Sequence, residues 1–88
     1  MSHLHENRKI LNRLSRLQGQ INAIQKTVND SEKSCVEVLQ QVAAVKGAVN
    51  GLMNELIEEH LKHHVLTGTQ YNESEMEEFF KLLKKYRE

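Results

Sequence analysis

The stretch from Cys35 to His64 constrains the fold of this chain more than any other. Its apolar side chains recur at intervals of three and four residues: Val38, Val42, Val45, Val49, Leu52 and Leu56. This periodicity is typical of a helix with one apolar face, and the chain contains no proline that would interrupt it. The pattern therefore predicts one long central helix, over about residues 33–65.

The ends of this expected helix carry different chemistry. Cys35 lies at one end, and His60, His63 and His64 lie at the other. Because a helix rises about 1.5 Å per residue, Cys35 and His60 would be roughly 37 Å apart on one straight helix. They cannot share a site within one copy of the helix. A second copy, packed antiparallel, would bring its histidine end to the first copy's cysteine.

Small residues in the middle of the same stretch are consistent with such a crossing. Glycine inside a helix costs about 1 kcal/mol relative to alanine, yet Gly47 and Gly51 lie here without a turn signal beside them. Their presence predicts that another backbone passes close to the middle of the helix.

Two shorter helices are expected on either side. Residues 6–28 and 74–87 have apolar side chains at helical spacing, and Ser74 is a plausible N-cap for the second of them. The turn-forming residues 29–34 and 67–69 separate the three helices. We found no strand pattern, so the expected fold is all-α, with three helices in a single domain over residues 1–88.

Charge is balanced overall but unevenly distributed. The formal net charge is zero, whereas the first 28 residues carry five Lys or Arg against one acid. Lys9, Arg13, Arg16 and Gln20 form a polar row beside the apolar seam of the first helix. A basic row on a neutral chain indicates an anionic partner such as nucleic acid. A solvated helix face is the alternative interpretation.

Length and cysteine content limit the remaining classes. An 88-residue chain dominated by an elongated helix buries little surface alone, which favours an oligomer. The one cysteine, without an export signal, favours a reducing cytosol. No apolar run approaches the length of a membrane span. We see neither an oxyanion element nor enough chain to enclose a substrate, so we do not expect an enzyme.

Metal binding is one interpretation of the histidines and the cysteine. His60 and His64 are four residues apart on one helix face, a spacing that lets two imidazoles reach one ion, although helix-surface histidines are often merely solvated. Cys35, at the start of a helix, is a metal ligand, a reactive thiolate or a small buried apolar residue. His3 lies in a short tail as an incidental residue or a mobile ligand.

Two longer segments carry a family resemblance. Arg-Leu-Gln-Gly-Gln-Ile at 16–21, Cys35, and Val-Leu-Gln-Gln-Val-Ala-Ala-Val-Lys-Gly-Ala-Val-Asn-Gly-Leu-Met at 38–53 resemble the CsoR/RcnR/FrmR family of bacterial metal- and aldehyde-sensing repressors. The resemblance covers essentially the whole chain. It implies antiparallel dimers with four-helix-bundle-like cores that pair into tetramers, and release of operator DNA when the ligand binds.

The resemblance also implies a ligand set and an effector. His3, Cys35, His60 and His64 match the RcnR-like nickel/cobalt branch, while His64 replaces the second cysteine of the copper branch. Copper(I) prefers thiolates, so the expected effector is nickel(II) or cobalt(II), with zinc(II) as a further candidate. The expected function is a cytoplasmic repressor of a metal efflux operon.

Two other functions remain open. A formaldehyde-responsive repressor would use Cys35, although Ser2 stands where that branch has a proline. A metal-buffering or purely structural helical oligomer would lack specific affinity for DNA.

The repressor interpretation also predicts DNA contacts and partners. The expected phosphate contacts are Lys9, Arg13, Arg16 and Lys46. The expected partners are operator DNA and further copies of the chain, as a homodimer or homotetramer.

Overall fold

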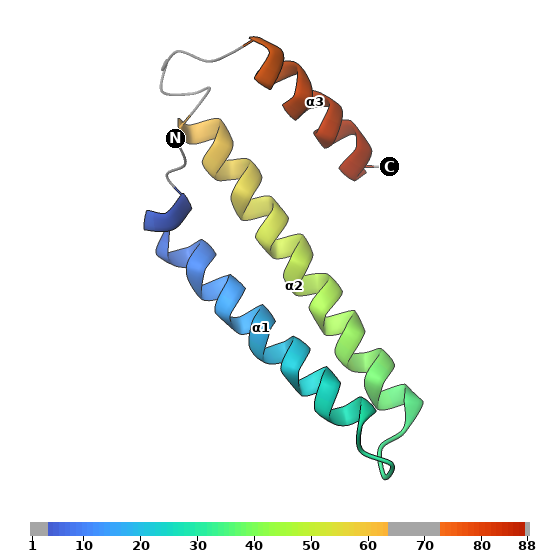
Figure 1. Ribbon diagram of the computed structural model, residues 1–88. Coiled ribbons are helices and arrows are strands. Elements are labelled where there is room, and N and C mark those ends of the chain that lie inside the picture. The colour runs from blue at the N-terminus through green and yellow to red at the C-terminus, as the bar shows by residue number, and fades with distance from the viewer. Residues whose placement is uncertain (1–3, 64–72, 88) are drawn as a thin grey trace. The chain divides into compact units, whose positions relative to one another are not determined.

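The computed structural model describes residues 4–63 and 73–87. It contains a short 3-10 turn, η1 (Leu4–Glu6), followed by three α-helices: α1 (Arg8–Val28), α2 (Cys35–Leu61) and α3 (Glu73–Arg87) (Figure 1). No strand occurs in these two ranges. The all-α class and the three helices are therefore confirmed. The chain divides into two compact units, Met1–Ile57 and Glu58–Glu88.

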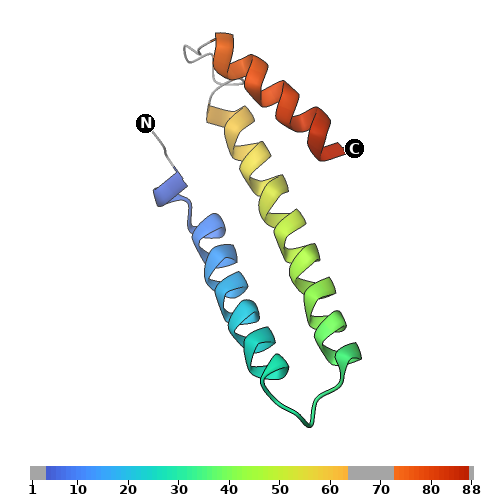
Figure 2. The same cartoon turned by 45° about the vertical axis from the view of Figure 1, so that its right-hand side comes forward.

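The first unit is an antiparallel helical hairpin. In both views α1 runs beside α2 in the opposite direction (Figures 1 and 2). Ile10 and Leu17, which are 3% and 7% exposed, are the buried hydrophobic residues of the described chain. The hairpin core of one chain is thus small, as expected from its length.

The apolar positions of both helices separate into two sets, each with a seven-residue repeat. On α1, Ile10, Leu17 and Ile24 are buried or half-buried, whereas three others are exposed: Leu14, Ile21 and Val28. On α2, three are half-buried, namely Val38, Val45 and Leu52, and two are exposed, namely Val42 and Val49. Leu56, seven residues after Val49, is half-buried and departs from this division. A helix needs two neighbours to cover both sets, so the hairpin covers one seam and leaves a second one open.

Caps set the starts of the first two helices. The Ile10 N–H donates to Oδ1 of Asn7 at 3.1 Å, so α1 begins at Arg8, while residue 6 belongs to η1. At α2 the Glu37 N–H donates to Oγ of Ser34 at 3.2 Å. The helix therefore begins at Cys35, rather than at residue 33 as predicted, because the Ser34 side chain satisfies a free N–H group of its first turn.

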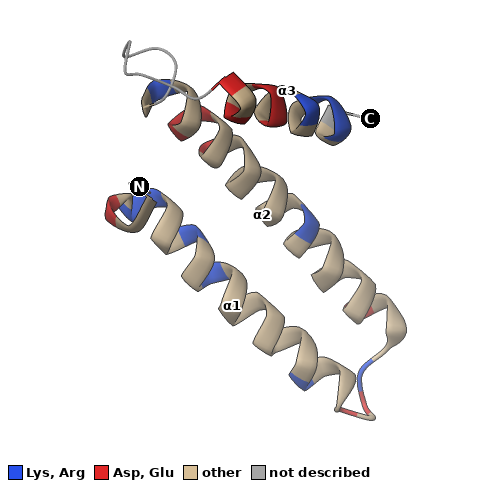
Figure 3. Cartoon of the chain, turned by 45° about the horizontal axis from the view of Figure 1, so that its top comes forward, with Lys and Arg blue, Asp and Glu red and all other residues tan. Residues whose placement is uncertain are grey.

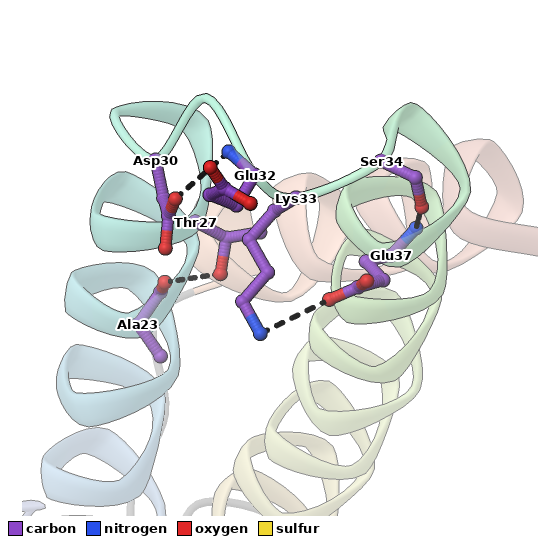
Figure 4. Close-up of polar contacts among 7 residues, drawn as sticks. All are labelled: Ala23, Thr27, Asp30, Glu32, Lys33, Ser34 and Glu37. Atoms are coloured by element: carbon purple, nitrogen blue, oxygen red, sulfur yellow. Dashed lines mark hydrogen bonds and ion pairs between the residues drawn. The ribbon is translucent and has the colours of Figure 1, made fainter.

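Local polar contacts stabilise the connection between α1 and α2 (Figure 4). The Thr27 hydroxyl donates to the Ala23 carbonyl at 3.0 Å, and the Glu32 N–H donates to Oδ1 of Asp30 at 2.9 Å. Lys33 and Glu37 add an ion pair at 3.7 Å. The predicted break at residues 29–34 is confirmed, and side chains of Asp and Ser supply the turn and the cap there.

α2 is continuous, as its periodicity predicts. It contains 27 residues, which corresponds to a length of about 40 Å at 1.5 Å per residue. The predicted end at residue 65 and the predicted break at residues 67–69 lie outside the described residues. No helix of the described chain is long and apolar enough to cross a membrane.

The second unit contains the end of α2 and α3. α3 begins at Glu73, so the prediction that Ser74 caps it is wrong, since Ser74 is already inside the helix. Acidic residues occupy its start and basic residues its end, the order that the helix dipole favours (Figure 3). The expected single domain over 1–88 stays a prediction.

Candidate functional site

Cys35 is the first residue of α2. It is exposed and carries a free thiol. The cap by Ser34 fixes the backbone around it, because the Val38 N–H also donates to the Ser34 carbonyl at 3.4 Å. Within one chain, Cys35 is therefore not buried; its surroundings in an assembly stay a prediction. An accessible sulfur at a helix start is suited to metal coordination or to attack on an electrophile.

His60 lies near the other end of α2 and is half-buried. Its ring centroid is 4.1 Å from that of Phe79 on α3, with 32° between the ring planes. Phe79 in turn lies 5.6 Å from Phe80. The second unit thus holds the His60 imidazole against an aromatic side chain, a neighbour that the sequence interpretation did not include.

His63 is separate from this aromatic contact. It lies just after the end of α2, and its Nε2 atom lies 3.3 Å from Oε2 of Glu59, four residues earlier in the chain. The contact with Glu59 supplies a local role for His63 that needs no metal.

The two remaining predicted ligands, His3 and His64, lie outside the described residues. Residues 4–63 and 73–87 contain no group of three or more His, Cys, Asp or Glu that could hold a metal ion. Cys35 and His60 lie at opposite ends of one continuous helix, so α2 of one chain does not bring them together. Coordination by both of them needs a second chain.

The basic residues differ in their surroundings. Lys9 and Arg16 on α1 and Lys46 on α2 are exposed, and Figure 3 shows basic residues spaced along α1. Arg13 is half-buried, and its Nη2 atom lies 3.9 Å from Oε1 of Glu55 on α2. Arg13 therefore differs from the uniform solvent-facing row that the sequence predicts, because it reaches across the hairpin to a carboxylate.

Gly51 lies one turn before Glu55 on α2 and leaves room for the Arg13 side chain. A Cβ atom added at Gly51 would be 2.6 Å from Nη1 of Arg13, while one added at Gly47 would meet nothing within 4 Å. At Gly51 the neighbour within the chain is thus a guanidinium group rather than a backbone. The predicted close approach of a second backbone stays a prediction.

Sequence reasoning did not include Glu55 or Gly51 among the functional residues. The sequence pattern that points to them is their four-residue spacing, which places a glycine and a carboxylate on one face of α2. The pairing of that face with Arg13 depends on how α1 and α2 are aligned, which the spacing alone does not reveal.

Comparison with known proteins identifies the family. The family model described as metal-sensitive transcriptional repressor matches residues 6–85. The chain belongs to this family of repressors. The expectation that it is not an enzyme is thereby confirmed, and family membership implies DNA binding and self-association.

Relatives and a solved structure agree with this assignment. The chain is 40% identical over 89 residues to the transcriptional repressor RcnR of Citrobacter koseri, covering 98% of each chain. It is 39% identical over 90 residues, at the same coverage, to an uncharacterized Serratia marcescens protein from the bioA 5′ region. A Glu-to-His variant of the formaldehyde-responsive regulator FrmR from Salmonella enterica serovar Typhimurium superposes with a TM-score of 0.78 at 41% identity. That match covers 89% of this chain and 90% of the other.

Proposed function

We propose that this repressor binds operator DNA and releases it on binding nickel(II) or cobalt(II), so that a metal efflux operon is derepressed. The observation that carries the proposal is the continuity of α2, with an exposed thiol at its first residue and His60 near its last. Two such helices packed antiparallel would bring the thiol of one chain beside the histidines of another. Assembly and sensing would then depend on the same contact.

The ligand set of the proposed site is His3, Cys35, His60 and His64. One thiolate with several imidazoles suits nickel(II) or cobalt(II), and zinc(II) accepts the same donors. The lack of a three-residue ligand group within residues 4–63 and 73–87 of one chain is compatible with a site shared between chains. A metal ion held by these residues would link two helices from different chains.

The proposed DNA contacts are Lys9, Arg13, Arg16 and Lys46, each to a phosphate. In a homodimer or homotetramer these contacts repeat, so affinity for DNA should fall steeply with salt. Metal would favour the form that binds DNA weakly, with a coupling free energy of about 1–3 kcal/mol. By linkage, operator DNA should weaken metal binding to the same extent.

A formaldehyde response is the second candidate function, and two observations favour it. The Cys35 thiol is exposed at the helix start, and one solved relative is a formaldehyde-responsive regulator. Formaldehyde would join this sulfur to a nearby amine through one methylene group, with loss of water. The crosslink, rather than a metal ion, would then change the relation between two chains.

The first prediction separates these two functions. Protein bound to a fluorescent duplex from upstream of its own gene is titrated in parallel with nickel(II), cobalt(II), zinc(II), copper(I) and formaldehyde, and anisotropy reports release. We expect release at near-stoichiometric nickel(II) or cobalt(II) and none with formaldehyde at the same concentration. Release by formaldehyde alone would favour the formaldehyde response, and saturation with nickel(II) without any change in DNA affinity would contradict the metal mechanism.

A further inference from the structure

Arg13 of α1 lies beside a carboxylate of α2 within one chain. Its Nη2 atom lies 3.9 Å from Oε1 of Glu55, and the two side chains are 36% and 19% exposed. A guanidinium group has five N–H donors, so a contact with one carboxylate oxygen leaves others for a second partner. The exposed third of the Arg13 side chain shows that one side of it still faces solvent.

Gly51 provides room for this arrangement. A Cβ atom there would lie 2.6 Å from Nη1 and 3.4 Å from Cζ of Arg13, so any larger residue would move the guanidinium group. Glu55 follows four residues later on the same helix face. Gly51 of α2 thus leaves space for the Arg13 guanidinium group, and Glu55, one turn later, places a negative charge beside it.

We propose that Gly51 and Glu55 form a seat on α2 that positions the Arg13 guanidinium group for a phosphate of operator DNA. This inference rests on the proposed DNA-binding role of Arg13. An arginine without neighbours loses side-chain freedom when it meets a phosphate, whereas Arg13 already has a carboxylate partner at 3.9 Å in the folded chain, so less of that freedom is left to lose. Glu55 and Gly51 are positioning residues, because they act on DNA through Arg13.

The alternative role for Glu55 is to compete with a DNA phosphate for the Arg13 guanidinium group. A carboxylate beside an arginine also draws it away from a phosphate, and removal of that carboxylate would then tighten DNA binding. The Glu55 side chain is half-buried, and its Oε1 atom lies 3.9 Å from Nη2 of Arg13. The two roles predict opposite effects of the same substitution, so one set of measurements decides between them.

The test compares Gly51→Ala with Gly47→Ala. Both substitutions replace a glycine of α2 and gain the same helix propensity, but only the first meets Arg13. We expect Gly51→Ala to weaken binding to the upstream duplex about tenfold and to lower the slope of log affinity against log salt by about 1 for each phosphate that Arg13 no longer neutralises. Gly47→Ala should leave both quantities at wild-type values once sedimentation shows an unchanged assembly.

Two further comparisons connect the effect to Arg13 and to charge. In an Arg13→Gln background, Gly51→Ala should have no additional effect on affinity. Glu55→Gln should weaken binding relative to Glu37→Gln, which removes the same charge from an exposed ion pair on the same helix. A change in the Arg13 Nε–H resonance of DNA-free Gly51→Ala and Glu55→Gln protein would report the displaced side chain directly.

Different results would disprove the positioning role of Gly51 and Glu55 and the proposed DNA-binding function. Wild-type protein that binds the duplex normally, with Gly51→Ala equal to Gly47→Ala at every salt concentration, overturns the seat alone. Tighter binding by Glu55→Gln than by Glu37→Gln overturns it in favour of competition. Absence of salt-dependent binding by the wild-type protein overturns the proposed function itself, and the role of the seat with it.

Discussion

His64 is the residue on which the choice of metal depends in the proposed site. Replacing this imidazole with a thiolate gives Cys35 a second sulfur partner, and copper(I) prefers such a pair over nickel(II). We therefore expect His64→Cys to raise affinity for copper(I) and to lower affinity for nickel(II), each by at least about tenfold, which corresponds to about 1.4 kcal/mol. Competition against a copper(I) chelator and the nickel–thiolate absorption band measure the two affinities.

His63→Cys is the matched control for this substitution. It adds the same sulfur one residue away, where the structure places the side chain in contact with Glu59. Its order of metal affinities should stay that of the wild-type protein. If both variants keep the wild-type order, His64 is not a ligand.

At the scale of the elements, the start of α1 depends on one side chain. Asn7 accepts the Ile10 N–H through its own oxygen, and Ile10 is a buried residue of the hairpin. Asn7→Ala leaves that N–H group unsatisfied, so the free energy of unfolding should fall by about 1 kcal/mol. Denaturation followed by circular dichroism at one chain concentration measures it. Asn12→Ala, an exposed position inside α1, should cause no loss, and an equal loss in both variants would contradict the cap.

The helices could be predicted from the sequence because each depends on nearby residues. Three- and four-residue apolar spacing, with Asn and Ser beside it, located α1 and α2 within two residues at their starts. The contact between Arg13 and Glu55 could not be predicted, because it joins residues far apart in sequence through the alignment of two helices. The contact of His60 with Phe79 likewise depends on tertiary packing. The ligand set was inferred through the family resemblance, and its assembly across chains stays a prediction.

At the scale of the whole molecule, one chain leaves an apolar seam uncovered. Leu14, Ile21 and Val28 on α1 are exposed, as are Val42 and Val49 on α2. Each set repeats every seven residues, the pattern of helices that pack in a bundle. Since the hairpin itself buries little, most of the stability of the protein should come from contacts between chains, and its Tm should rise with concentration.

Val42→Glu tests this dependence on assembly. Val42 is 48% exposed in one chain, and burying a valine fully contributes about 1.5–3 kcal/mol, whereas burying an unpaired carboxylate is strongly unfavourable. Sedimentation velocity should therefore show a smaller species than the wild-type protein, with a Tm that no longer depends on concentration. Gln40→Glu adds the same charge at an exposed polar position of α2 and should sediment as the wild type does. Wild-type sedimentation of Val42→Glu would mean that this seam is not an interface between chains, and the proposed metal site would then need another arrangement of α2.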